Sequence, residues 1–365
     1  MNLRDFGYMH MAYSLAEKAV GRVSPTPYVG AVAVRRGVIV GTGYHAGPGK
    51  PHAEIVALAQ AGRRAEGATV YITLEPCVHW GRTPPCVDSL IQARLKRVVI
   101  SDLDANPLVF KRGVRRLKQE GLPVECGLLS EKNRRLNEIY IKYITRKTPF
   151  VAVKSAISLD GRLATRTFDS RWISSAETRE YVHLLRGEYD ALMVGINTVL
   201  RDDPQLTIRH PRWKDKPLTR VVVDSRLRFP LEAKMLKTQD RGNIIVFTRP
   251  EASRRKAAAL EKKGVRVVPV PGKGPRVDLR AVLARLADTE IAALLVEGGG
   301  TLVSSLFQAR LADKVFLALS PKLIGGSTAP AFIAGAGVPR LSEALSLKDT
   351  RVFSLGSDII VEGYI

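Results

Sequence analysis

Short apolar runs rich in Val and Ile recur along this chain of 365 residues, and segments of helical character separate many of them. Two such runs are "ATVYITLEP" (68–76) and "TRVVVDS" (219–225). Strands that alternate with helices build layered α/β structures. The sequence therefore predicts an α/β fold along its whole length. The glycine fingerprint G-x-G-x-x-G of standard dinucleotide-binding folds does not occur in it.

The length favours two domains, because a domain typically holds about 150 residues. The first α/β pattern ends within "YITRKTPF" (143–150), where Pro149 precedes a new strand, "FVAVKSAIS". We therefore expect one domain over residues 1–147 and a second over 148–365.

The net charge of +22 suggests nucleic-acid binding at first sight. The basic residues are spread over both halves of the chain, however, and such a field also attracts small anionic substrates. There is no apolar run of about 18 residues, which predicts no membrane span, and no signal peptide is recognisable. Three cysteines do not form a disulfide framework, so a reducing cytoplasm is the simplest compartment.

Four residues form a pattern typical of a catalytic zinc site. His52 and Glu54 lie at the start of a predicted helix, Cys77 follows the strand 68–75, and Cys86 begins the next helix. One imidazole and two thiolates suit zinc and leave a fourth position for water. Glu54 could then move protons between that water and a leaving group. Zinc deaminases of nitrogen heterocycles divide the work in this way.

Several alternatives remain open from the residues alone. His79, inside the cysteine loop, could be a fourth ligand, a substrate contact or a structural residue. A nucleic-acid base deaminase would agree with the charge, but eight residues separate the two cysteines where such enzymes usually have two. A nucleic-acid-binding module with a structural zinc would need a fourth protein ligand and would leave Glu54 without a role.

The stretch "TLEPCVHWGRTPPC" (73–86) resembles the bifunctional deaminase–reductases of riboflavin biosynthesis. This resemblance implies an N-terminal cytidine-deaminase-like α/β/α sandwich and a C-terminal dihydrofolate-reductase-like α/β domain. It extends through four further motifs in the family's order: "VKSAISLDGRLA" (153–164), "SRWISS" (170–175), "LLRGEYDALMVGINTVLRDDPQLTIR" (184–209) and "VEGGGTL" (296–302).

The resemblance implies two reactions on a phosphorylated pyrimidine nucleotide, with neither nucleic acid nor membrane as partner and with a homo-oligomer, dimer or tetramer, as the assembly. The first domain would remove an exocyclic amine with Zn²⁺ held by His52, Cys77 and Cys86 and with Glu54 as the proton shuttle. The second would reduce the ribose to a ribityl chain with NADPH. The implied substrate contacts are Lys154, Ser170, Arg186, Leu206, Arg209, Glu297, Asn106 and His79. The implied cofactor contacts are Ala156, Trp172, Thr198, Asp202, Ser225, Gly298, Gly299, Gly300 and Thr301.

The chain departs from the family at one position that is thought to touch the base. Where the family has an Asn between two prolines, "SPTPYVG" has Thr26, whose hydroxyl offers one donor in place of an amide pair. In the second domain, Ser225 and Arg226 follow a predicted strand and could contact the 2′-phosphate of NADPH. The carboxylate of Asp224 would repel that phosphate unless it points away, and the sequence leaves its direction open.

Overall fold

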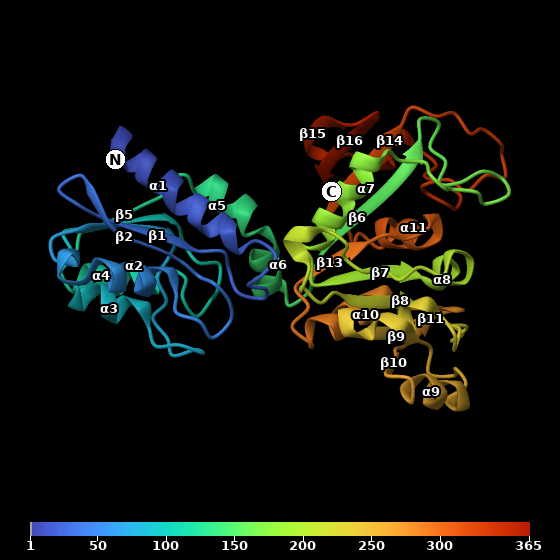
Figure 1. The fold of residues 1–365 in the computed structure, drawn as a ribbon, viewed down its shortest axis with the longest axis horizontal. Coiled ribbons are helices and arrows are strands. Elements are labelled where there is room, and N and C mark those ends of the chain that lie inside the picture. Colours follow the sequence, from blue (N-terminus) through green and yellow to red (C-terminus); the bar gives the residue numbers. More distant parts are fainter. Residues whose placement is uncertain (1) are drawn as a thin grey trace. The chain divides into compact units, whose positions relative to one another are not determined.

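The computed structural model describes residues 2–365, with only the backbone described at Lys273. Contacts divide the chain into two compact units, of which the first ends at Thr148 and the second spans Pro149–Ile365. Each unit contains its own sheet (Figure 1). The division falls one residue from the boundary expected between 147 and 148.

Unit 1 contains a five-stranded sheet in the order β2-β1-β3-β4-β5. β1 runs antiparallel to both β2 and β3, whereas β3, β4 and β5 are parallel. Helices α1 and α5 lie on one side of this sheet, and α2, α3 and α4 lie on the other (Figure 1). The elements are α1 (Leu3–Ala16), β1 (Gly30–Arg35), β2 (Val38–Tyr44), α2 (Ala53–Ala61), β3 (Thr69–Leu74), α3 (Cys86–Gln92), β4 (Arg97–Asp102), α4 (Arg112–Gln119), β5 (Val124–Cys126), α5 (Ser130–Leu136) and α6 (Glu138–Arg146).

Close packing of α2 on β2 fixes the place of the H-x-E motif. Gly43 faces the first turn of α2 so closely that a Cβ there would lie 2.3 Å from the carbonyl oxygen of Ala53. Any larger residue at position 43 would push the helix off the sheet. His52 is the N-cap of α2 and Glu54 lies in its first turn, so the missing side chain at Gly43 sets how near both residues lie to the sheet.

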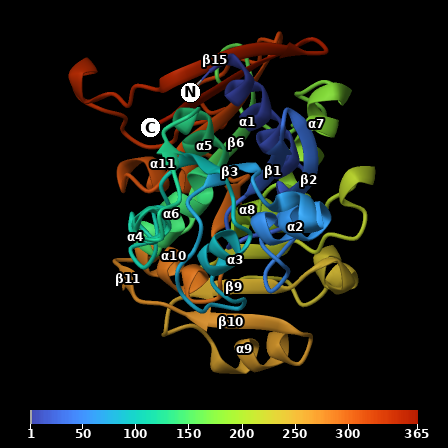
Figure 2. The ribbon, with the colours of Figure 1, turned by 90° about the vertical axis from the view of Figure 1, so that its left-hand side faces the viewer.

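Unit 2 contains a nine-stranded sheet in the order β10-β9-β8-β7-β13-β6-β14-β16-β15, in which β15 and β10 are the edges (Figure 2). The strands from β10 to β14 in this order are parallel, and β16 runs antiparallel to β14 and β15. The main elements are β6 (Phe150–Ser158), α7 (Ala176–Arg186), β7 (Ala191–Gly195), α8 (Ile196–Asp202), β8 (Thr219–Val223), β9 (Ile244–Thr248), α9 (Arg254–Glu261), β10 (Val265–Pro269), β11 (Gly272–Lys273), β12 (Arg276–Val277), α10 (Leu279–Ala287), β13 (Ala293–Val296), α11 (Gly300–Gln308), β14 (Lys314–Ser320), β15 (Lys348–Leu355) and β16 (Asp358–Tyr364).

One apolar core of unit 2 lies between its sheet and two helices. Val282 and Leu286 of α10 and Val303 and Leu306 of α11 pack against the buried side chains of β6, β7, β8 and β13. Central parallel strands are buried on both faces, which explains why they appear in the sequence as continuous apolar runs. Among the described residues, none of the helices is long and apolar enough to span a bilayer.

Candidate functional site

The three predicted zinc ligands meet in unit 1. His52 caps α2, Cys77 follows β3, and Cys86 is the first residue of α3. His52 Nδ1 lies 3.0 Å from Cys86 Sγ and 3.6 Å from Cys77 Sγ, and all three ligand atoms lie within 4.8 Å of one another. Zinc bonds of about 2.0–2.3 Å in a tetrahedron place ligand atoms about 3.5–4 Å apart. The geometry of these side chains therefore fits a zinc ion.

Thr83 orients the histidine, and its place in the cysteine loop is the only feature of the sequence that could have pointed to it. Its Oγ1 lies 3.2 Å from His52 Nε2, so Nε2 can donate its hydrogen to the hydroxyl. Nδ1, the ring atom that faces both sulfur atoms, is then left as the ligand atom. A partner on the outer nitrogen is what fixes the tautomer of metal-binding histidines.

The two thiols influence each other's ionisation. A hydrogen bond from the Cys86 thiol lowers the pKa of Cys77 to about 4. The same contact, together with burial, raises the pKa of Cys86 above its ordinary value. Two neighbouring thiolates repel each other, and a bound divalent cation stabilises both. Both cysteines are unoxidised, as metal ligation requires.

Glu54 is buried beside this cluster, with 3% of its surface exposed. Burial raises the pKa of its carboxyl to about 7, although His52 acts in the opposite direction. Its Oε2 is buried and has no hydrogen-bond partner among residues 2–365. Buried carboxyl oxygens are normally satisfied. An orphaned acceptor next to three metal ligands is the arrangement that a metal-activated water would complete.

Thr26 has no hydrogen left to donate to a substrate. Its Oγ1 lies 2.5 Å from the carbonyl oxygen of Val23, which can only accept, and 2.9 Å from His45 Nε2. The hydroxyl therefore donates to Val23 and accepts from His45. The ring of His45 in turn packs edge-on against that of His52, with centroids 5.2 Å apart.

The two other predicted contacts of unit 1 lie in loops. Asn106 Oδ1 accepts a hydrogen bond from the Leu108 N–H at 3.0 Å, and its own N–H donates to Asp104. The side chain of Asn106 thus also shapes its own turn. His79 has a buried Nδ1 without a partner among residues 2–365, and it does not join the cluster of potential metal ligands in that part of the chain.

In unit 2 the structure brings Lys154, Arg186 and Glu297 together. Arg186, at the end of α7, pairs with Glu297, directly after β13, through two hydrogen bonds of 2.7 Å each. Their side chains are 12% and 14% exposed. Burial lowers the pKa of Lys154, and Glu297 opposes this effect. The family resemblance implies that Arg186 contacts the substrate, but in the structure its guanidinium fork faces Glu297.

Leu206 and Arg209 lie on the segment that follows α8. Leu206 is buried, and its neighbour Thr207 accepts a hydrogen bond from Arg186 Nη1 at 2.9 Å. The exposed side chain of Arg209 has no hydrogen bond or ion pair among the residues described. Arg209 is therefore available to a ligand, whereas Arg186 is largely engaged within the protein.

The predicted cofactor residues lie mainly where parallel strands end, which is where open α/β sheets bind ligands. Thr198 and Asp202 are on α8 after β7, Ser225 follows β8, and Ala156 lies in β6. Ser225 Oγ accepts from the Val277 N–H at 3.1 Å, so its hydrogen can still be donated. Asp224, whose direction the sequence left open, is fully buried and accepts from the Phe229 N–H.

The glycines at 299 and 300 differ in how much space surrounds them. A Cβ at Gly300 would lie 2.3 Å from the carbonyl oxygen of Ala331, whereas one at Gly299 would meet nothing within 4 Å. Gly299 is the N-cap of α11 and provides no side-chain cap. The first N–H groups of α11, including that of Thr301, therefore suit an anion at this end of the helix.

Ser170 and Trp172 share a loop that a lysine stabilises. Lys322 Nζ donates to the carbonyl oxygens of Trp172 and Ile173, and the Arg179 guanidinium lies 4.5 Å from the centre of the Trp172 ring. The Trp172 side chain is 63% exposed. Trp172 is therefore not part of the apolar core.

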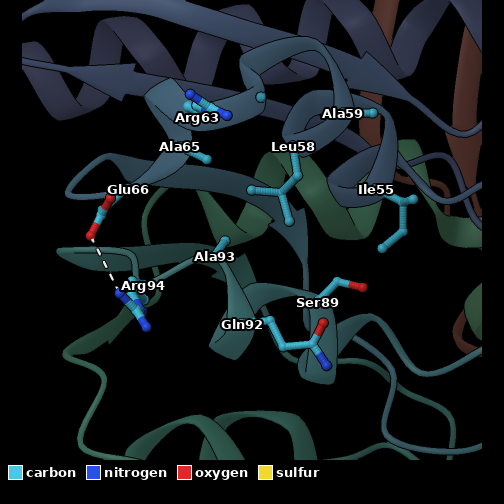
Figure 3. Close-up of a pocket in the computed structure, with 11 residues that line it drawn as sticks. Ile55, Leu58, Ala59, Arg63, Ala65, Glu66, Ser89, Gln92, Ala93 and Arg94 are labelled. Carbon is cyan, nitrogen blue, oxygen red and sulfur yellow. Dashed lines mark ion pairs between the residues drawn. The ribbon is translucent and has the colours of Figure 1, made fainter.

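A separate groove of about 610 Å³ lies between α2 and α3 (Figure 3). Ile55 and Leu58 line it from α2, and Ser89 and Gln92 line it from α3. At one end Glu66 and Arg94 form an ion pair of 3.8 Å. The zinc ligands and Glu54 are not among the described residues that line the groove, so the chemistry is not assigned to it.

Comparison with known families assigns each unit to a class. Residues 4–102 match the zinc-binding region of cytidine and deoxycytidylate deaminases, and residues 149–361 match the RibD C-terminal domain. The chain is thus a zinc deaminase domain followed by a reductase domain of the RibD type.

Full-length relatives identify the family. The riboflavin biosynthesis protein RibD of Aquifex aeolicus is 43% identical over 98% of this chain and 97% of its own length. That of Escherichia coli K12 is 37% identical, with 98% of each chain covered. The chain belongs to the RibD family and is a bifunctional deaminase and reductase of riboflavin biosynthesis.

Solved structures agree with this assignment. Acinetobacter baumannii RibD has a TM-score of 0.87 and 34% identity, and the match covers 99% of this chain and 98% of that one. A Thermotoga maritima protein, described as a diaminohydroxyphosphoribosylaminopyrimidine deaminase/5-amino-6-(5-phosphoribosylamino)uracil reductase, has a TM-score of 0.86 with the same identity and coverage. The predicted fold class, family and pair of activities are confirmed.

Proposed function

We propose that unit 1 hydrolyses an exocyclic amine of 2,5-diamino-6-(5-phosphoribosylamino)pyrimidin-4-one, and that unit 2 then reduces the ribose of the product to a ribityl chain with NADPH. One observation carries the first half: the buried, partnerless Oε2 of Glu54 beside the cluster of His52, Cys77 and Cys86. The family restricts the substrate to a phosphorylated pyrimidine nucleotide of riboflavin biosynthesis, and the Thermotoga maritima relative is described with compounds of this class.

His52, Cys77 and Cys86 would hold zinc, which when bound supplies the Lewis acidity that activates a water molecule. Glu54 Oε2 accepts a proton from the attacking water and delivers it to the departing amine nitrogen. The ring carbon gains an oxygen and loses its amine, which leaves as ammonia. The buried carboxyl suits this shuttle, because its pKa of about 7 allows both gain and loss of a proton near neutrality.

In unit 2, Lys154 and Glu297 would contact the ribose, and Ser170 and Leu206 would complete the substrate site. Arg186 holds the Glu297 carboxylate in one orientation through its paired hydrogen bonds. Arg209 supplies an unpaired guanidinium for the phosphate of the substrate. Among the described groups, it has no carboxylate partner that would compete with such an anion.

NADPH, when bound, supplies the hydride for the reduction of the ribose. Its phosphates suit the N-terminus of α11, where Gly299 leaves open space and Gly300 lets the segment at Ala331 approach. Thr198, Asp202 and Ser225 would contact its remaining parts from the neighbouring strand ends, with Ala156 and Trp172 near the nicotinamide.

The variant Glu54→Gln tests the proton shuttle. The amide preserves the shape of the side chain but cannot carry the proton, so ammonia release should fall by about 10²–10⁴-fold. Zinc content and NADPH-dependent reduction should persist. Glu66→Gln is a matched control on the same unit, because the Glu66 side chain is 63% exposed and pairs only weakly with Arg94. Undiminished ammonia release from Glu54→Gln would refute the assignment.

A further inference from the structure

One face of α7 holds the segment that carries Arg209. His183 and Arg186 lie three residues apart near the end of this helix and therefore project from the same side. Arg186 Nη1 donates to the carbonyl oxygen of Thr207 at 2.9 Å. His183 Nδ1 accepts the backbone N–H of Arg209 at 3.3 Å. Two side chains of one helix thus bind the backbone of the segment 207–209 at points two residues apart.

The role of His183 in this contact is unambiguous. A backbone N–H can only donate, so the Nδ1 atom of His183 must be an acceptor and its hydrogen must be on Nε2. Protonation of the ring would abolish the contact. Burial, with the nearby charges of Arg186 and Arg209, lowers the pKa of His183 to about 4, while Glu297 acts in the opposite direction. The ring therefore stays neutral at physiological pH.

The guanidinium of Arg209 is an unpaired cation that lies near a second cation, Arg186. The groups around it on the described chain include Arg186 and His183, and Glu297 is already neutralised by Arg186. A cation in this position attracts an anion. The direction in which the Arg209 side chain points depends on the backbone that carries it. The contact with His183 acts directly at that backbone.

We propose that His183 is a positioning residue of the reductase unit. By accepting the Arg209 N–H it fixes the segment 207–209 so that the Arg209 guanidinium meets the phosphate of the pyrimidine substrate. This proposal rests on the phosphate-binding role given to Arg209 under the proposed function. His183 itself need not touch the substrate.

The test compares His183→Leu, His183→Asn, Arg209→Gln and the double variant His183→Leu/Arg209→Gln. Each is assayed for NADPH-dependent reduction of the phosphorylated substrate and of its dephosphorylated riboside. Loss of one hydrogen bond of this kind corresponds to an effect of about three- to ten-fold. His183→Leu should therefore raise KM for the phosphorylated substrate by about that factor, with little change in kcat and none for the riboside.

Rescue and coupling make the test specific. Asn presents Oδ1 near the position of Nδ1, so His183→Asn should restore KM to within about two-fold. The double variant should have the same KM for the phosphorylated substrate as Arg209→Gln alone, because the effects of substitutions that act through one contact are not additive. His210→Leu is the matched control, since the His210 ring accepts from the Arg212 N–H instead. Deamination by unit 1 in each preparation reports the concentration of folded chain.

The contrary outcomes are distinct. If Arg209→Gln leaves KM for the phosphorylated substrate unchanged, the phosphate-binding role of Arg209 is wrong. If Arg209→Gln raises KM for the phosphorylated substrate but His183→Leu does not, His183 does not position Arg209. The same conclusion follows if the increases in KM caused by the two substitutions add in the double variant. If His183→Leu raises KM equally for the riboside and the phosphorylated substrate, or if His210→Leu raises KM as much as His183→Leu does, the effect is a general structural one. Either result would also overturn the proposal. Should His183→Leu not fold, His183→Gln replaces it, because its acceptor lies near the position of Nε2 and not of Nδ1; KM for the phosphorylated substrate should then rise in His183→Gln and not in His183→Asn, and equal KM values in the two variants would overturn the proposal.

Discussion

Substitution of Arg186 should show how much the ion pair with Glu297 contributes to the free energy of unfolding of unit 2. In Arg186→Met the side chain keeps most of its apolar length but loses both hydrogen bonds to the Glu297 carboxylate. That carboxylate is 14% exposed, so water replaces the lost partner poorly. Leaving one member of a buried pair unpaired typically costs about 3–5 kcal/mol.

The pKa of Glu297 gives a second estimate of the same interaction. Burial alone would raise this pKa, but Arg186, with a smaller contribution from Lys154, lowers it from 4.5 to about 2. The difference corresponds to about 3 kcal/mol of stability. Because the pKa is lowered in the folded state, this stability is fully present above pH 4.5 and is lost as the pH falls toward 2. The cost of Arg186→Met should therefore shrink by about 1 kcal/mol between pH 7 and pH 4.

Urea unfolding followed by tryptophan fluorescence measures this cost. Trp213 of unit 2 is buried, whereas Trp80 and Trp172 are exposed, so the change in emission reports mainly on unit 2. Arg285→Met is the matched control, because the pair of Arg285 with Asp288 is well exposed and such pairs contribute at most about 1 kcal/mol. Equal destabilisation by both substitutions, or a cost for Arg186→Met that is independent of pH, would refute the reasoning.

Two further predictions concern the zinc and cofactor sites. Thr83→Val removes the hydrogen-bond partner of His52 Nε2. We expect zinc affinity, measured in competition with a chelator, to fall by about 10–100-fold. The control Thr145→Val, on the exposed face of α6, should not change the zinc affinity. Arg226→Ala should weaken binding of 2′,5′-ADP by about ten-fold or more in calorimetry and leave 5′-AMP unaffected; equal effects on both ligands would place the 2′-phosphate elsewhere.

The zinc ligands could be predicted because each is defined by residue type and local position. His52 begins a helix, Cys77 ends a strand and Cys86 begins the next helix. In a parallel β-α-β arrangement such ends gather at one edge of the sheet. The alternation of apolar runs and amphipathic segments fixed the fold class for the same reason: it depends on neighbours in sequence.

The partners of individual polar side chains were decided by the tertiary structure. Arg186 and Glu297 are 111 residues apart in the chain, and they meet because the fold brings the end of α7 beside the end of β13. Periodicity shows which face of a strand is apolar, but it does not show which strand lies beside it. The same holds for Thr83 with His52 and for His183 with Arg209. The sequence by itself determined which reactive side chains the protein has. The tertiary arrangement of the strands and helices determined which other side chains hold them in place.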